Sequence, residues 1–249
     1  MLFLQKIVAT LWKIYFLICL IITLLLLYPF YRVLLMNEKY FRIGFQLCRF
    51  HSLLMQILGG VYYTIIKKPK LSPDKKYIIV SNHTSYLDII LTTRIFSNYF
   101  LFMGKKELGK VPLFNIFFKK FNILVDRNSI SASHKAFVEA AERINRGASM
   151  VIFPEGTIPH HAPKLKSFKS GAFRLAIDKQ LDVVPVVFLD SWKMLADKKF
   201  FSHLARPGIA RVVIHEPIST KGMNENDLLF LQNLVYHQIE DTLKEYKII

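Results

Sequence analysis

Cysteine is scarce in this chain, and a common hydrolase signature is missing. The 249 residues include two cysteines, Cys19 and Cys48, which both lie in the apolar N-terminal region without metal-binding or redox spacing. We therefore expect neither a disulfide framework nor a cysteine nucleophile. No Gly-x-Ser-x-Gly motif is present, which argues against a hydrolase with a nucleophilic serine. Because repeats and low-complexity segments are also lacking, the length predicts one globular domain with an N-terminal attachment.

Acidic residues are also few. The chain has 18 Asp and Glu against 34 Lys and Arg, for a formal net charge of +16. Such an excess suits a partner that carries phosphate, such as a lipid surface or an anionic substrate. Nucleic acid would suit the charge equally well. However, 52% of the residues are hydrophobic and no zinc-finger, homeodomain or RNA-recognition signature is present, so we predict no nucleic-acid partner.

Charge is absent from residues 14–31, an apolar stretch between Lys13 and Arg32. Its length just suffices to cross or enter a bilayer. A cleaved signal peptide would end in small residues at an Ala-x-Ala-like site, whereas Pro29 and aromatic residues stand here. We therefore predict an N-terminal membrane anchor that persists in the mature protein. The sequence leaves open whether this anchor spans the bilayer or bends back at Pro29.

Basic residues that flank the stretch predict its orientation, because cytoplasmic flanks of membrane segments carry an excess of Lys and Arg. Four basic residues follow the stretch and two precede it: Arg32, Lys39, Arg42 and Arg49 against Lys6 and Lys13. The sequence therefore predicts a membrane-associated protein whose main body faces the cytoplasm, at the inner membrane if the source is bacterial.

An amphipathic helix and then a turn-rich segment are predicted after the anchor. Apolar residues recur every three or four positions from Ile43 to Val61, which is typical of a helix with one apolar face. That face would lie along the membrane surface or cover the core of the protein. Residues 67–74 are charged and contain two prolines, which indicates a boundary. We therefore predict membrane-anchoring helices over residues 1–66 and a globular domain over residues 67–249.

Short apolar strands alternate with helices beyond this boundary. The patterns predict strands over residues 77–81, 150–153 and 183–188, and helices over residues 86–96, 133–146, 169–179 and 226–245. Continuous apolar strands separated by helices are typical of a mostly parallel sheet that is covered on both faces. The sequence therefore predicts an α/β fold with such a sheet at its centre.

The first candidate site follows the strand 77–81. His83 lies in the connection to the next helix, and Asp88 lies in the first turn of that helix. Ligand sites of α/β sheets collect at such strand ends. A carboxylate at this spacing can accept a hydrogen bond from one ring nitrogen and so orient the other as a general base. The alternative is a Ser-x-x-Asp capping box, from Ser85 to Asp88, that only starts the helix.

The second candidate site follows the strand 150–153, so it can face the same cleft. Gly156 allows close approach of the backbone to a ligand, Glu155 can accept a hydrogen bond from a hydroxyl, and Thr157 can donate one. The alternative is a plain β-turn over Pro-Glu-Gly-Thr.

Together with two further segments, these motifs resemble the family of glycerolipid acyltransferases typified by 1-acyl-sn-glycerol-3-phosphate acyltransferase. Residues 82–88 look like the family's first block, an Asn-His pair with Asp five residues after the His. The other blocks resemble residues 104–108 with 125–127, residues 153–157 and residues 183–186. Four blocks in the family's order, within residues 77–190, are far more specific than any one of them.

The resemblance implies a direct acyl transfer without an acyl-enzyme intermediate, a cofactor or a metal ion. His83, oriented by Asp88, would deprotonate the hydroxyl of the acceptor, lysophosphatidate, and the oxygen would attack the thioester carbonyl of acyl-CoA or acyl carrier protein. Arg and Lys suit the acceptor's phosphate, although their alternative role is attraction to anionic membrane lipid. The matching blocks imply these substrate-binding residues: Asn82, Lys105, Arg127, Glu155, Gly156 and Thr157.

One residue departs from the family's pattern. Arg commonly follows Phe-Pro-Glu-Gly-Thr, whereas Ile158 stands here. The missing guanidinium puts the acceptor's head group in doubt, so another lysolipid, such as a lyso-ornithine lipid or a lysophospholipid, is an alternative acceptor. His160 and His161 follow closely and would replace the charge only weakly. A non-catalytic membrane lipid-binding protein of the same fold is the second alternative, although it would have no need of a general base.

Overall fold

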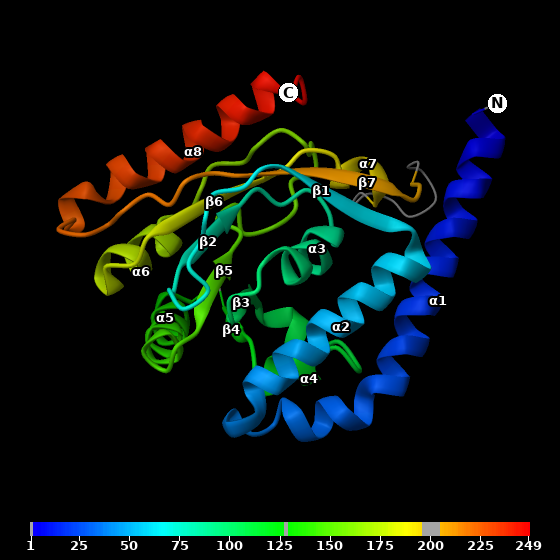
Figure 1. Cartoon of the computed structure of the whole chain (residues 1–249), viewed down its shortest axis with the longest axis horizontal. Helices are drawn as coiled ribbons and strands as arrows, with labels where there is room; N and C mark the ends of the chain where they lie inside the picture. Colours follow the sequence, from blue (N-terminus) through cyan, green and yellow to red (C-terminus); the bar gives the residue numbers. More distant parts are fainter. Residues whose placement is uncertain (1, 127–128, 196–204) are drawn as a thin grey trace.

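The computed structural model describes residues 2–126, 129–195 and 205–249, and it contains a seven-stranded sheet (Figure 1). The strands lie in the order β1-β7-β6-β2-β5-β3-β4. Their bounds are β1 Val61–Lys67, β2 Ile78–Ser81, β3 Phe100–Lys105, β4 Ile123–Val125, β5 Ser149–Ile152, β6 Val183–Phe188 and β7 Gly208–Ile214. The helices are α1 Leu2–Leu34, α2 Phe41–Gly59, α3 Leu87–Ile95, α4 Ile116–Lys119, α5 Ile130–Asn145, α6 Gly171–Lys179, α7 Ser191–Met194 and α8 Leu228–Glu245, with 3₁₀ turns at Glu38–Tyr40, Lys106–Lys110 and Glu225–Asp227.

Five neighbouring strands of the sheet run parallel. β2 pairs with both β5 and β6, β3 pairs with β5 and β4, and all these pairings are parallel. β7 is antiparallel to β6, and β1 runs parallel to β7. The carboxyl ends of β2, β3, β4, β5 and β6 therefore meet at one edge of the sheet, which is where ligand sites of α/β folds collect.

Helices cover both faces of this sheet (Figure 1). α5, α6 and α8 form one layer, and α2 and α3 lie on the other side. β2, β5 and β6 are buried along their whole length, which explains why their sequences are continuous apolar runs without alternation. The predicted α/β fold with a mostly parallel sheet and helices on both faces is confirmed.

The predicted helices and strands are present, with ends that differ by a few residues. α8 buries the expected apolar stripe of Leu228, Leu231, Val235, Ile239 and Leu243. Sequence patterns missed β1, β3, β4 and β7. β4 is only three residues long, and β1 alternates buried and partly exposed positions within a segment that was predicted to be helical. Helix α2 ends at Gly59, so the predicted boundary at residue 66 falls inside a strand of the sheet.

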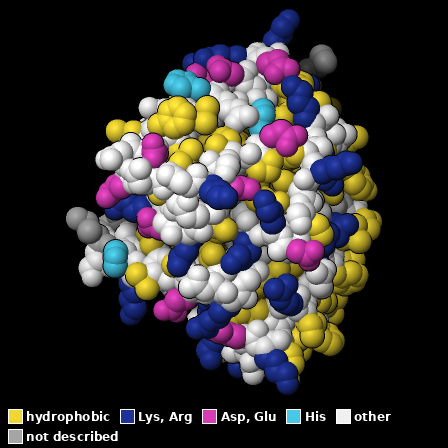
Figure 2. Space-filling view, turned by 60° about the vertical axis from the view of Figure 1, so that its left-hand side comes forward, with side chains coloured by type: hydrophobic (Ala, Val, Ile, Leu, Met, Phe, Trp, Pro, Cys, Tyr) yellow, Lys and Arg dark blue, Asp and Glu magenta, His cyan; other side chains and the backbone are white. Residues whose placement is uncertain are grey.

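Helix α1 is the one helix in the described residues that is long and apolar enough to cross a membrane, by length and composition. It packs against α2: the Trp12 indole donates to the Gly59 carbonyl at 3.2 Å, and the Thr23 hydroxyl lies 2.9 Å from His51 Nε2. Most of its other apolar side chains are exposed. Figure 2 shows hydrophobic side chains along one edge of the molecule, with Lys and Arg scattered over the face in view. This long apolar helix supports the predicted membrane association.

Helix α2 has apolar side chains on two sides, one buried and one exposed. Phe41, Phe45 and Met55 are buried in the core of the protein. Ile43, Phe50 and Ile57, which are spaced by seven residues, are 57%, 48% and 56% exposed. The role of covering the core is therefore confirmed for one side of this helix, and contact of the exposed apolar row on another side with a membrane surface stays a prediction.

Candidate active site

His83 and Asp88 meet at the carboxyl end of β2. His83 Nδ1 lies 3.0 Å from Asp88 Oδ2. The side chain of Asp88 is fully buried, whereas that of His83 keeps 12% of its surface exposed. A buried carboxylate that holds one ring nitrogen leaves Nε2 as the nitrogen that can take a proton from a substrate.

Asp88 is held by four hydrogen bonds. Its Oδ2 accepts from the backbone N–H groups of Thr84 and Ser85, at 2.7 and 2.9 Å, as well as bonding to His83. Its Oδ1 accepts from the hydroxyl of Ser191. The capping interaction and the orientation of His83 are therefore not alternatives, because one carboxylate does both. The arrangement fixes the carboxylate as the hydrogen-bond acceptor of the imidazole.

Two residues of this site were missed by the sequence patterns. Ser191 is fully buried and follows the carboxyl end of β6, so the strand-end rule could have found it. Phe153 follows β5, and its ring stacks on the His83 ring with centroids 4.0 Å apart and planes 16° from parallel. Asp88 holds the edge of the imidazole at Nδ1, and the Phe153 ring covers one of its faces. Together the two contacts restrict the orientation of the imidazole.

The segment after β5 forms the predicted turn. The Gly156 N–H donates to the Phe153 carbonyl at 3.0 Å, and Gly156 has φ 79°, a conformation that residues with a side chain rarely adopt. Thr157 at the end of the turn is exposed. Glycine is therefore favoured at position 156 because of its backbone conformation. The turn also places Glu155 beside the loop that carries His83.

Glu155 is buried, with 1% of its surface exposed, and both its oxygens accept backbone hydrogen bonds. Oε1 accepts from the His83 N–H and Oε2 from the Lys166 N–H, each at 2.8 Å. The Glu155 carboxyl group thus joins the turn after β5 to the loop that carries His83. Asn82, which is also fully buried, forms two hydrogen bonds with the backbone of Phe188, at 3.0 and 2.8 Å. These contacts give Glu155 and Asn82 positioning roles, and direct contact with substrate stays a prediction for both.

The basic residues that were predicted to bind phosphate are not buried beside His83 as Asp88 and Glu155 are. Lys105 ends β3 at the same edge of the sheet, is exposed, and forms a 3.7 Å ion pair with Glu107. Its neighbour Lys106 bonds instead to Asp126, at 2.6 Å. Arg127 lies outside the described residues. Of the two predicted phosphate partners, the described residues include Lys105 alone, which lies at the same edge of the sheet as His83.

Ile158, the departure from the family's pattern, is buried, with 7% exposed. His160 and His161 are exposed on the loop that follows. Among the described residues, no group of three or more His, Cys, Asp and Glu side chains could hold a metal ion. At position 158 the chain therefore has an apolar residue that packs inward.

Stability should depend on pH through Glu155. Burial raises the pKa of this carboxyl from about 4.5 to about 7, although the N–H groups of His83 and Lys166 oppose the rise. The folded protein then binds more protons than the unfolded chain between these two values. The free energy of unfolding should therefore fall by about 3 kcal/mol through this group as the pH rises from about 4.5 to 7.

Denaturant unfolding at several pH values would measure this. The Glu155→Gln variant should lack this contribution, whereas exposed Glu216→Gln should keep the pH dependence of the wild type. Equal pH slopes for Glu155→Gln and the wild type would contradict the prediction.

Comparison with known proteins adds independent findings. A family model described as Acyltransferase matches residues 63–189. The mouse 1-acyl-sn-glycerol-3-phosphate acyltransferase alpha is 26% identical over 86% of this chain and 69% of its own length. The yeast (Saccharomyces cerevisiae) 1-acyl-sn-glycerol-3-phosphate acyltransferase is 28% identical over 80% of this chain and 64% of its own length. The crystal structure of the 1-acyl-sn-glycerophosphate acyltransferase PlsC from Thermotoga maritima has the same fold, with a TM-score of 0.80, 22% identity and 98% of each chain covered.

Proposed function

Because the chain belongs to the acyltransferase family, we propose that it transfers a fatty acyl chain from a thioester donor to the free hydroxyl of 1-acyl-sn-glycerol-3-phosphate, giving phosphatidate. The single observation that carries the proposal is the 3.0 Å contact between His83 and buried Asp88, at the carboxyl edge of the parallel sheet. The names of the relatives support the choice of acceptor.

The proposed reaction has two proton transfers through His83. Nε2 takes the proton of the acceptor hydroxyl while the oxygen attacks the thioester carbonyl. The imidazolium that forms is stabilised by Asp88, to which Nδ1–H donates its hydrogen bond. When the carbon–sulfur bond breaks, Nε2 returns the proton to the thiolate, and ester and thiol leave. The donor, on this proposal, is acyl-CoA or acyl carrier protein.

The acceptor's phosphate is assigned to basic residues at the carboxyl edge of the sheet. Lys105 ends β3 there, next to β5 and the turn with Gly156 and Thr157. An exposed ion pair such as Lys105–Glu107 is worth little, so the ammonium is free to exchange its partner for a phosphate. The assignment of Arg127 rests on the matching block alone. The basic flank of α1 supports a site on the cytoplasmic side of the membrane.

The acceptor assay tests this proposal. Purified full-length protein with labelled acyl-CoA should form phosphatidate from lysophosphatidate and little product from a panel of neutral and zwitterionic lysolipids. Acyl carrier protein charged with the same chain would identify the preferred donor.

Buried Ile158 is the observation that favours a second candidate, an acyltransferase for another lysolipid. Product from one of those lysolipids alone would establish this second function and overturn the first. Binding of lysolipids without any transfer would leave the alternative of a non-catalytic lipid-binding protein.

A further inference from the structure

Two partly buried arginines lie on neighbouring helices, close enough to repel each other, and neither has an acidic partner among the described residues. Arg49 lies on α2 and Arg94 in the last turn of α3, and these two helices pack together. The Nε atom of each guanidinium is buried and has no hydrogen-bond partner. Burial lowers the pKa of Arg49, and the positive charge of Arg94 lowers it further. Two like charges that are partly removed from water, each with an unpaired Nε donor, are costly unless an anion joins them.

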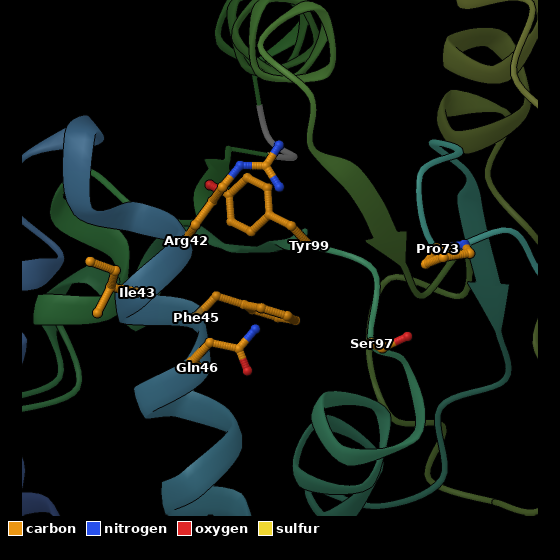
Figure 3. A pocket seen from close by; sticks show the side chains of 7 residues that line it. All are labelled: Arg42, Ile43, Phe45, Gln46, Pro73, Ser97 and Tyr99. Atoms are coloured by element: carbon orange, nitrogen blue, oxygen red, sulfur yellow. The ribbon is translucent and has the colours of Figure 1, made fainter.

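A hollow of about 360 Å³ lies beside α2, one helical turn before Arg49, and its lining includes neither Arg49 nor Arg94 (Figure 3). Arg42 and Gln46 line it from α2, and Ser97, three residues beyond Arg94, lines it from the loop after α3. In Figure 3 Arg42 lies beside the ring of Tyr99, and the guanidinium is 5.1 Å from the ring centroid. Hydroxyl, amide and guanidinium donors therefore line the hollow. It lies where β3 begins, at the opposite edge of the sheet from His83.

Of the two acidic residues near the hollow, Asp74 follows the lining residue Pro73, and Glu38 is already paired. Glu38 acts on Tyr99 electrostatically, but its carboxylate forms ion pairs with Arg143, at 3.0 Å, and with Arg146. Among the described residues, no carboxylate is paired with Arg49 or Arg94. The balance of charge at this place therefore favours an anion from outside the chain.

Helix α2 also shows which anion fits. Arg42 and Arg49 are seven residues apart, so they lie on one side of the helix, and each is followed by an exposed apolar residue, Ile43 and Phe50. Gln56 and exposed Ile57 repeat the pattern, and the Gln56 amide nitrogen is also buried without a partner. A row of donors beside a row of exposed apolar side chains matches a phospholipid, with its phosphate on the donors and its acyl chains on the apolar row.

We propose that Arg49 and Arg94, with Arg42 at the edge of the hollow, bind the phosphate of an anionic membrane phospholipid at the junction of α2 and α3. This site is separate from the catalytic edge of the sheet. The bound lipid neutralises the two guanidinium groups and thereby fastens helix α2 to α3. Anionic lipid then stabilises the junction of the anchor and the catalytic domain.

The test uses the purified full-length protein in neutral detergent micelles that contain phosphatidylglycerol, phosphatidylcholine or no phospholipid. Thermal unfolding and mass spectrometry of retained lipid are the two readouts. We expect phosphatidylglycerol to be retained and to raise Tm, and phosphatidylcholine to do neither. The Arg49→Gln/Arg94→Gln variant should bind phosphatidylglycerol about 30-fold more weakly. The Arg174→Gln/Lys179→Gln variant, which loses two charges from α6 on the other face of the sheet, should behave as wild type.

Three results would overturn the proposal. An unchanged response of the Arg49→Gln/Arg94→Gln variant to phosphatidylglycerol would place the lipid elsewhere, the catalytic site included. A Tm rise with inorganic phosphate equal to that with phosphatidylglycerol would show that the site takes free phosphate. The third is a lower Tm of this variant without lipid, because removal of two unpaired like charges should not destabilise the protein unless they serve packing.

Discussion

His83→Ala should lower the rate of acyl transfer by about a hundred- to ten-thousand-fold, the usual contribution of a general base. The methyl group cannot take the proton of the acceptor hydroxyl, so the hydroxyl must attack in its neutral form. His83 retains exposed surface and its ring stacks on Phe153, so its removal should leave the core packing in place. Initial rates with the identified acceptor and saturating acyl-CoA would measure the effect.

The matched control is His134→Ala, because His134 is an exposed histidine on α5 outside the site. Its rate should equal that of the wild type, and both variants should retain the circular dichroism spectrum and membrane association of the wild type. A folded His83→Ala protein with the wild-type rate would exclude His83 as the base and with it the proposed mechanism.

Asp88→Asn should lower the rate almost as far, again by about a hundred-fold or more. An amide has no charge to stabilise the imidazolium, and its NH₂ group cannot accept a hydrogen bond from Nδ1. The substitution also removes hydrogen bonds that the Asp88 carboxylate accepts from other residues. Asp88 accepts hydrogen bonds from Thr84 N, Ser85 N and the Ser191 hydroxyl, and an amide cannot accept at both ends.

Both kcat and KM should be measured for this variant, together with its unfolding free energy. We expect kcat to fall and KM for the acceptor to change little, because Asp88 is fully buried and bonds only to groups of the protein. The matched substitution Asp178→Asn, at an exposed position of α6, should change neither. Wild-type kcat in folded Asp88→Asn would show that Asp88 only caps the helix.

Much of the fold and the His83–Asp88 contact could be predicted because the signals are local. β2, β5 and β6 are continuous apolar runs, and α8 repeats apolar residues at helical spacing. His83 and Asp88 are five residues apart, so a strand end and one helical turn suffice to bring them together. β4 and β1 escaped detection because a strand of three residues or a half-exposed strand at the end of the sheet carries little pattern of its own.

The roles of single polar residues were harder to predict. Glu155 and Asn82 were expected to contact substrate, since both follow strands at the catalytic edge. The structure shows that their polar atoms are bonded to the backbone of this chain. A polar residue beside a site has two possible partners, the substrate and the protein, and sequence patterns cannot distinguish them.

By itself the sequence determined the long apolar N-terminal segment, the α/β class, the family and the spacing of His83 and Asp88, because periodicity, charge and short spacings are properties of the chain. Only the tertiary structure decided what surrounds that pair. The Ser191–Asp88 bond joins residues 103 positions apart, and the His83–Glu155 bond joins residues 72 apart. Arg49 and Arg94, whose Nε atoms have no partner, lie on two helices that pack together. These contacts follow from the order of parallel strands and the packing of helices on them, which places distant segments side by side.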